Sequence, residues 1–280
     1  MVYSKVLVPY DGSVSAQNVL KQVARLGDLK VLHVISIFPV YEGDLELLGI
    51  GNVEEMLKGP VQDLLDEAVK LVSNPSFEIK TRALYGEPYE KIVEYARDSK
   101  CEVIVMGRRG TSRLERQLVG SVTAKVGANA REDVLVMPQN SRLVWNKLLI
   151  AMDESDQAQK ALDRAISFAL EHGSQLEMVH VIYTYGNFCA ILPKAVKEMR
   201  RRAKVFGDKM KAVARQKGVE LEVNIVEGDI HDGIVRVANE KAADMILMGP
   251  YGRKGLPRLV IGSVTEKVMG MVEIPVLAVH

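Results

Sequence analysis

The chain has 280 residues, 48% of them hydrophobic, and its 37 Lys and Arg residues nearly balance its 36 Asp and Glu residues. This length predicts two domains of about equal size, because single domains usually have roughly 100 to 200 residues. The even charge balance argues against nucleic acid or an anionic membrane as a partner, and no apolar run approaches the roughly 18 residues that span a bilayer.

Strands that alternate with helices are predicted throughout the first half. Ser13 is placed to cap a helix that runs to about Leu26, and further helices are expected near 53–72, 88–98 and 120–129. Most of the strand-like runs are continuous in Val, Ile and Leu, which indicates burial on both faces of a parallel sheet. They are KVLVPY (5–10), KVLHVISI (30–37), FEIKTRAL (77–84), EVIVMG (102–107) and DVLVMP (133–138).

The second half repeats this order. Its strand-like runs are KLLIAMDES (147–155), SQLEMVHVIY (174–183), VELEVNIV (219–226), ADMILMG (243–249) and IPVLAVH (274–280). Its helices are expected to about His172 and near 193–217, 231–240 and 262–270. We therefore predict an α/β chain of two tandem doubly wound (Rossmann-like) domains, residues 1–140 and 141–280. Each domain should hold a five-stranded parallel sheet and about four helices.

The repeat has a constant spacing. Matching residues lie 142 positions apart at Asp11 and Asp153, Gly86 and Gly228, Gly107 and Gly249, Gly120 and Gly262, and Val134 and Val276. At the second strand the match slips, because His33-Val34 pairs with His180-Val181 at a spacing of 147. We attribute the slip to a changed connection, since loops tolerate insertions and deletions.

The N-terminal sequence MVYSKVLVPYDGS lacks the basic, apolar and small-residue regions of a signal peptide. Cys101 and Cys189 are too few for a disulfide framework or a cysteine-rich zinc site, so we expect both thiols to be reduced and mostly buried. These features predict a cytoplasmic protein.

One glycine pattern occurs in both halves: Gly, two residues, Gly, nine residues, Gly-Ser. The first glycine ends the fourth strand, where open parallel sheets bind ligands at a change of winding direction. Glycine lets backbone amides approach an anion, and the Gly-Ser pair would open a helix whose N-terminal dipole favours phosphate. The glycines could equally form only tight strand-to-helix turns. The residues are Gly107, Gly110, Gly120 and Ser121, and Gly249, Gly252, Gly262 and Ser263.

At these residues the sequence resembles the universal stress protein family, which carries this glycine pattern. The resemblance covers essentially the whole chain, as two family domains in tandem. It extends to the aspartate after the first strand, the valine of the second, the apolar residue before the first glycine and the valine after Gly-Ser. These are Asp11 and Asp153, Val34 and Val181, Met106 and Met248, and Val122 and Val264.

The resemblance implies that the chain binds ATP, or AMP or ADP, with Mg²⁺ coordinated mainly by the phosphates. The glycine loop would hold the triphosphate, the aspartate and its neighbours the ribose and adenine, and the second-strand valine backbone the adenine edge. In the first half the implied site residues are Pro9, Tyr10, Asp11, Val34, Met106, Gly107, Arg109, Gly110, Gly120, Ser121 and Val122. In the second half they are Ala151, Met152, Asp153, Val181, Met248, Gly249, Tyr251, Gly252, Gly262, Ser263 and Val264.

The last strand of a family domain typically pairs with that of another domain. The resemblance therefore implies that DVLVMP and IPVLAV pair within this chain and relate the two domains by a pseudo-twofold axis. It also leaves room for a homodimer and for a protein partner that the sequence does not identify.

The two loops depart from the family pattern in different ways. Arg113 stands where the second loop has Gly255, and the family commonly has glycine there. Together with Arg108, Arg109 and Arg116, this cation would either neutralise a triphosphate or prevent the first loop from closing. In the second loop, Pro250 and Tyr251 stiffen and fill the turn.

Three functions are compatible with the sequence. The first is a stress-response protein whose bound ATP drives a regulatory or assembly change, the second is a nucleotide-free scaffold for a protein partner, and the third is a weak ATPase. The chain has no P-loop, nucleophile elbow or metal-binding helix motif, so we assign no catalytic residue and no protein metal ligand.

Some residues also have plain structural interpretations. Asp11 and Asp153 could act only as carboxylates at helix N-termini, and His33 and His180 are expected to be core or edge residues. The basic run at 200–204 lies near Glu198 and Asp208, which is typical of a solvated helix face and not of a nucleic-acid site.

Overall fold

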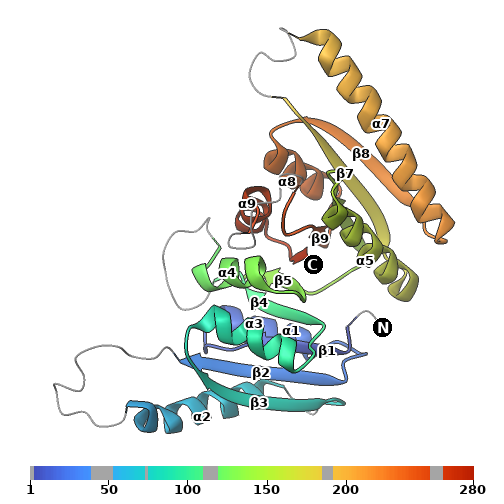
Figure 1. The fold of residues 1–280 in the computed structure, drawn as a ribbon. Coiled ribbons are helices and arrows are strands. Elements are labelled where there is room, and N and C mark those ends of the chain that lie inside the picture. Colours follow the sequence, from blue (N-terminus) through green and yellow to red (C-terminus); the bar gives the residue numbers. More distant parts are fainter. Residues whose placement is uncertain (1–2, 39–52, 73–74, 110–118, 185–191, 253–260) are drawn as a thin grey trace. The chain divides into compact units, whose positions relative to one another are not determined.

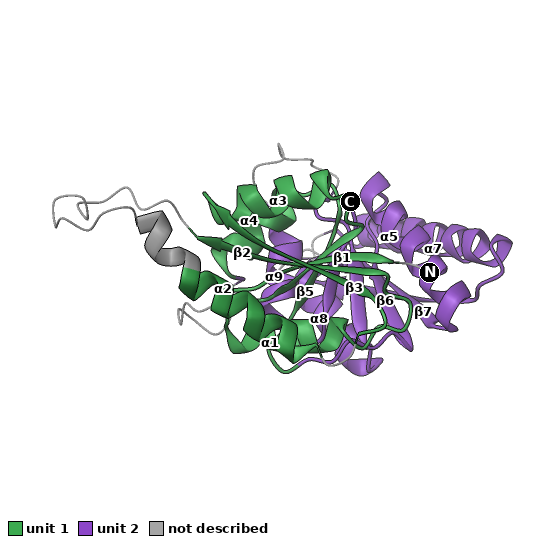
Figure 2. Ribbon diagram, turned by 90° about the horizontal axis from the view of Figure 1, so that it is seen from below, with its two compact units in different colours: residues 1, 3–114, 120–140 green, residues 2, 115–119, 141–280 purple. Residues whose placement is uncertain are grey.

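The computed structural model describes residues 3–38, 53–72, 75–109, 119–184, 192–252 and 261–280 (Figure 1). The chain divides into two compact units (Figure 2). Unit 1 lies mainly within residues 3–140 and unit 2 mainly within residues 141–280. Among the described helices, none is long and apolar enough to cross a bilayer.

Unit 1 holds a parallel sheet in the strand order β3-β2-β1-β4-β5. Helices α1 and α2 pack together, as do α3 and α4. The pairs cover opposite faces, since Tyr10 reaches Glu67 on α2 whereas His33 reaches Tyr95 on α3. The elements are β1 (Lys5–Pro9), α1 (Val14–Val23), β2 (Val31–Phe38), α2 (Val53–Leu71), β3 (Glu78–Tyr85), α3 (Pro88–Asp98), β4 (Val103–Gly107), α4 (Ser121–Asn129) and β5 (Asp133–Met137).

Unit 2 repeats the arrangement, with a parallel sheet in the order β10-β9-β6-β7-β8. Helix α7 lies along β7 and β8, and α8 packs with α9 (Figure 1). The elements are β6 (Lys147–Ala151), α5 (Asp156–His172), β7 (Gln175–Tyr183), α7 (Pro193–Gln216), β8 (Leu221–Gly228), α8 (Ile230–Glu240), β9 (Met245–Met248), α9 (Ser263–Met271) and β10 (Val276–Ala278). The predicted fold class, two doubly wound α/β units in tandem, is confirmed.

The central strands of each sheet are fully covered. Leu7 and Ile104 in unit 1, and Leu149 and Ile246 in unit 2, have no exposed surface. Burial of such a side chain contributes about 1.5 to 3 kcal/mol, which is why unbroken Val, Ile and Leu runs predicted these strands correctly.

The sequence pattern was less accurate at the ends of elements. Helix α1 was expected to reach about Leu26, but it ends at Val23, with Ala24 as its C-cap. The amides of Arg25 and Leu26 donate instead to carbonyls three residues back, at 3.2 and 3.0 Å. The helix therefore finishes in a tighter 3₁₀-like turn, which is common at helix ends.

Candidate functional site

The candidate site lies where the winding direction of each sheet changes. Strand β1 pairs with β2 on one side and β4 on the other, and β6 pairs in the same way with β7 and β9. The carboxyl ends of such a central strand pair form the crevice in which open α/β sheets bind ligands. At these ends the structure brings together Asp11 with Gly107, and Asp153 with Gly249.

The aspartates that follow the first strand of each unit shape the turn into the next helix. Oδ1 of Asp11 accepts a hydrogen bond from the amide of Ser13 at 3.0 Å, and Oδ1 of Asp153 accepts one from Ser155 at 3.1 Å. Each serine then caps its helix through its side-chain oxygen. The structural role proposed for the aspartates, at the start of a helix, is thus present.

The glycine that ends the fourth strand packs closely against the helix that follows the first strand. A Cβ added to Gly107 would lie 2.2 Å from Oγ and 2.9 Å from Cβ of Ser15, on α1. A Cβ on Gly249 would lie 2.7 Å from Cβ of Gln157, on α5. Packing alone therefore requires glycine at both positions, whether or not a phosphate approaches them.

The Gly-Ser pair begins a helix in both units. The amide of Gly120 donates to the carbonyl of Arg108, and that of Gly262 donates to Pro250, both at 2.8 Å. Thr123 and Thr265, which the sequence analysis did not single out, secure the same turns. Their hydroxyls donate to the carbonyls of Gly107 and Gly249, at 3.1 and 2.9 Å. The shared GSVT sequence was the signal that would have found them.

The first turns of α4 and α9 differ from those of α1 and α5. Ser13 and Ser155 cap α1 and α5 through their side chains, whereas Gly120 and Gly262 offer no side chain, and neither α4 nor α9 has a side-chain cap bond. Their first amides therefore keep the capacity to bind an anion, beside the exposed hydroxyls of Ser121 and Ser263. Val122 and Val264 follow in the same turns, half-buried.

The loops between the fourth strand and this helix are described in part. Gly110, Arg113, Arg116 and Gly255 lie outside the described residues. In unit 1, Arg108 and Arg109 are half-buried, and Cα of Arg109 lies 3.5 Å from the Cβ position of Gly120. In unit 2, a Cβ on Gly252 would lie 2.9 Å from Oδ2 of Asp153. The aspartate and the glycine loop of unit 2 are thus in direct proximity.

Most of the remaining predicted residues lie at the strand ends, and Tyr10 is the exception. Met106 and Met248 are buried immediately before the glycines, Pro9 and Ala151 end the first strands, and Tyr251 is half-buried in its loop. Tyr10 is buried, and its hydroxyl donates to Glu67 on α2 at 3.2 Å. Burial and the Glu67 charge raise the pKa of Tyr10 to about 12. The Tyr10 side chain therefore points into the α1/α2 layer and not toward the crevice.

The predicted match of His33-Val34 with His180-Val181 is wrong. In the hydrogen-bond register, Ile35 lies opposite Pro9 and Val179 lies opposite Ala151. Ile37, and not Val34, therefore occupies the position of Val181. Val34 lies further back, opposite Val8, without exposed surface. Identical dipeptides misled the comparison, because register is set by chain geometry and not by letter identity.

The two histidines accordingly sit in different surroundings. Nδ1 of His33 lies 3.0 Å from the hydroxyl of Tyr95, and burial, with the charges of Lys80 and Lys5, lowers the pKa of His33. Nδ1 of His180 lies 2.9 Å from the carbonyl of Met152. Both are buried, as expected of core or edge residues.

One cysteine lies within the described residues. Cys101 is buried, and burial raises the pKa of its thiol to about 12, so it stays protonated and unreactive at neutral pH. Cys189 lies outside the described residues.

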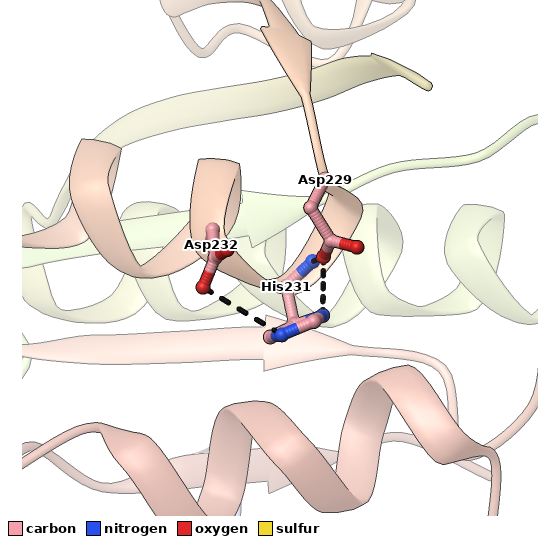
Figure 3. A group of neighbouring side chains, drawn as sticks. All are labelled: Asp229, His231 and Asp232. Atoms are coloured by element: carbon pink, nitrogen blue, oxygen red, sulfur yellow. Dashed lines mark hydrogen bonds and ion pairs between the residues drawn. The ribbon is translucent and has the colours of Figure 1, made fainter. Parts of the chain in front are cut away.

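A group of metal-ligand type residues lies apart from the crevice, at the start of α8 (Figure 3). Asp229 accepts a hydrogen bond from the amide of His231 at 3.1 Å and pairs with the His231 ring, whose Nε2 lies 3.6 Å from Oδ1 of Asp232. The positive end of the helix dipole favours these carboxylates and disfavours a cation. We interpret the group as a helix cap.

The chain was compared with known proteins. Residues 2–138 and 145–280 each match the family model described as the universal stress protein family. The chain is 28% identical over 296 residues to a universal stress protein of Synechocystis sp., covering 97% of this chain and 98% of that protein. It is 33% identical over 148 residues to universal stress protein YxiE of Bacillus subtilis, covering 49% of this chain and 100% of that protein. A crystal structure of a universal stress protein from Archaeoglobus fulgidus shares the fold, with a TM-score of 0.72 at 21% identity, over 98% of this chain and 97% of that one.

Proposed function

The chain belongs to the universal stress protein family as two tandem domains, and we propose that each domain binds ATP or another adenine nucleotide at its sheet crevice. In this proposal the domains comprise residues 1–140 and 141–280, and nucleotide occupancy regulates the conformation or assembly of the protein.

The observation that carries the proposal is the uncapped first turn of α4 and α9. In each unit this turn lies at the carboxyl end of the central strands and presents amides beside an exposed serine hydroxyl. Amides at a helix N-terminus and the helix dipole together favour a phosphate. The contrast with the serine-capped α1 and α5 supports a ligand at α4 and α9.

Residue roles follow from this geometry. The amides and hydroxyls of Ser121 and Ser263 would bind the phosphates, and the carboxylates of Asp11 and Asp153, beside the serine turns that they accept from, would accept hydrogen bonds from ribose hydroxyls. Ile37 replaces Val34 as the proposed partner of the adenine edge in unit 1, opposite Val181 in unit 2. Mg²⁺ would neutralise phosphate charge while held by the phosphates themselves.

Calorimetric titration of the nucleotide-free protein with ATP and Mg²⁺ tests the proposal. We expect two equivalents in the wild type and one in either Ser121→Glu or Ser263→Glu, because the new carboxylate takes the place of phosphate and repels it. A carboxylate in the first turn of a helix stabilises it by about 0.3 to 1 kcal/mol, so folding should be preserved.

Ser121→Thr is the matched control, since it keeps a hydroxyl at the same position and should retain both equivalents. Absence of heat at millimolar ATP, in protein that also releases no nucleotide on denaturation, would overturn the proposal and favour the nucleotide-free scaffold.

A further inference from the structure

Unit 2 contains a cavity of about 540 Å³, open to solvent on one side, between α5 and α7. Its floor is apolar and comprises Met152, Phe206 and Met210. Ser155 and Gln159 line it from the start of α5, and both are half-buried. The volume falls within the range of roughly 300 to 1,000 Å³ that is usual for small-molecule sites.

The repeat shows how the corresponding space is filled in unit 1. Tyr10 and Met152 are equivalent, because each follows the first strand and donates its amide to the second, to Ile35 and Val179 respectively. In unit 1 the Tyr10 ring is buried against α2, and its hydroxyl bonds to Glu67. In unit 2 the equivalent residue is Met152, which is buried and lines the cavity.

A second exchange affects the rim. Gly12 adopts φ +75° in unit 1, where the space next to it is occupied by Leu64 of α2, 2.9 Å from the Cβ position. The equivalent residue of unit 2, Glu154, adopts φ +64° and lines the cavity. Residues other than Gly, Asn and Asp seldom adopt this conformation. The replacement of Gly12 by Glu154 therefore puts a charged side chain at the rim, on a backbone conformation better suited to glycine.

The walls carry charges of both signs, and the cations gather on one side. Arg201, Arg202 and Lys209 project from α7, and Glu154 and Asp156 from the opposite wall. Asp156 lies in the first turn of α5, where the helix dipole compensates its charge.

The two arginines are linked to a single carboxylate. Arg201 and Arg202 bond to Glu198, at 2.8 and 3.0 Å, and these bonds lower the pKa of Glu198 to about 2. All three side chains are substantially exposed, so these ion pairs are weak. An anionic ligand can therefore take the place of Glu198 beside the arginines at little cost in free energy.

We propose that this cavity is a second ligand site, distinct from the nucleotide crevice, for a small organic anion with an aromatic body. The body lies on the floor against Phe206, its carboxylate, sulfonate or phosphate meets the α7 cations, and Ser155 or Gln159 accepts a donor group. The cavity shares Met152 with the implied nucleotide site, but the residues that line it do not include Gly249, Gly262 or Ser263, so its contacts differ from those proposed for the phosphates.

The test uses 8-anilinonaphthalene-1-sulfonate, which has an aromatic body, an anionic group and an N–H donor. The full chain is labelled with ¹³C at its methionine methyl groups and titrated with this probe while NMR spectra are recorded. We expect saturable shifts at Met152 and Met210. The neutral analogue N-phenyl-1-naphthylamine should bind more weakly, because it lacks the sulfonate that meets the cations.

Three variants sharpen the test. Met152→Tyr introduces the unit 1 residue, fills the cavity and should weaken binding at least tenfold, as read from the Met210 methyl. Met152→Leu is the matched control and should retain affinity within about twofold. Lys209→Gln should weaken binding of the sulfonate roughly two- to fivefold, as expected for an exposed charge, and leave the neutral analogue unchanged.

Saturable shifts at Met210 that Met152→Tyr abolishes and Met152→Leu preserves support the proposal. Shifts confined to other methionines, or equal binding to Met152→Tyr protein that circular dichroism shows to be folded, would overturn it. Displacement of the probe by ATP, with ATP itself shifting Met152 and Met210, would also overturn it, because the cavity would then belong to the nucleotide site. Failure of ATP to bind at all would refute the proposed function and leave this site standing.

Discussion

Units 1 and 2 agree at the carboxyl ends of their central strands and differ on the face covered by the helices after the first two strands. At the strand ends both units have an aspartate turn, a close-packed glycine and a threonine that bonds to that glycine's carbonyl. On the helix face, unit 1 buries Tyr10 against Glu67, whereas unit 2 has a cavity over Met152.

This comparison separates what the two units share from what each has acquired. The shared geometry coincides with the proposed nucleotide crevice, and the divergent geometry coincides with the proposed second site. The duplication thus supplies an internal control, because a residue of one unit can be placed in the other at an equivalent backbone position.

The largest expected effect tests the shared packing. Gly107→Ala and Gly249→Ala should each destabilise the fold by about 1 to 3 kcal/mol, because the new Cβ overlaps Ser15 or Gln157. Denaturant unfolding measures the change. Gly27→Ala is the control: a Cβ there meets nothing within 4 Å, so stability should be unchanged or slightly higher. An unchanged free energy of unfolding in Gly107→Ala and Gly249→Ala would contradict the claim that packing requires these glycines.

The next effect tests whether the two loops bind phosphate alike. Unit 1 has Arg108 and Arg109 where unit 2 has Pro250 and Tyr251. In a Ser263→Glu background, which isolates unit 1, Arg108→Gln with Arg109→Gln should weaken ATP binding about tenfold, since charge-assisted hydrogen bonds are lost. Affinity at unit 1 should also fall more steeply with added salt than affinity at unit 2. If calorimetry showed the same salt dependence of ATP affinity at the two units, this expected difference would be contradicted.

A smaller effect depends on pH and arises in unit 1 alone. Tyr10→Phe removes the bond to Glu67 and should cost about 1 kcal/mol of unfolding free energy at pH 7. The folded pKa of Tyr10, about 12, lies above its ordinary value of 10.0, so the stabilisation is complete below pH 10 and is lost as pH rises toward 12. The difference between wild type and variant should shrink over that window.

Denaturant unfolding at several pH values measures this change. Tyr183, which is 51% exposed, provides the control, and Tyr183→Phe should shift stability by less than about 0.5 kcal/mol at any pH. A wild-type advantage over Tyr10→Phe that persists unchanged at pH 12 would refute the assignment.

The smallest effect concerns an equivalent core position at which the two units have different small residues. Cys101 in unit 1 corresponds to Ala243 in unit 2, and both are buried at 6% exposure. Cys101→Ala should therefore cost no more than about 1 kcal/mol, because unit 2 already packs alanine at this place. A thermal shift that corresponds to several kcal/mol would show that the two cores differ more than their backbones do.

Most of the fold was predictable because it depends on local signals. Hydrophobic runs revealed the buried strands, and the spacing of 142 revealed the duplication. That Asp11 and Gly107 would lie near one another was also predictable, since Asp11 follows β1, Gly107 ends β4, and a doubly wound sheet pairs these two strands.

What the sequence did not reveal depends on contacts between distant residues. The mismatch of Val34 with Val181 could be recognised only from the hydrogen-bond register. The need for glycine at position 107 could be recognised only from the packing of Ser15 against it. The cavity at Met152 could be recognised only from the packing of α7, because methionine is an ordinary core residue and its presence does not predict a cavity. Nothing in residue periodicity specifies such side-chain packing between elements.

The central claim is that the uncapped first turns of α4 and α9 hold nucleotide phosphate. Backbone amide NMR during titration with ATP and Mg²⁺ tests it most directly, with the amides of Ser121, Val122, Ser263 and Val264 as reporters. We predict large, saturable shifts at both pairs, while the serine-capped first turns of α1 and α5 change little. Saturable ATP binding that leaves all four amides unmoved would contradict the account.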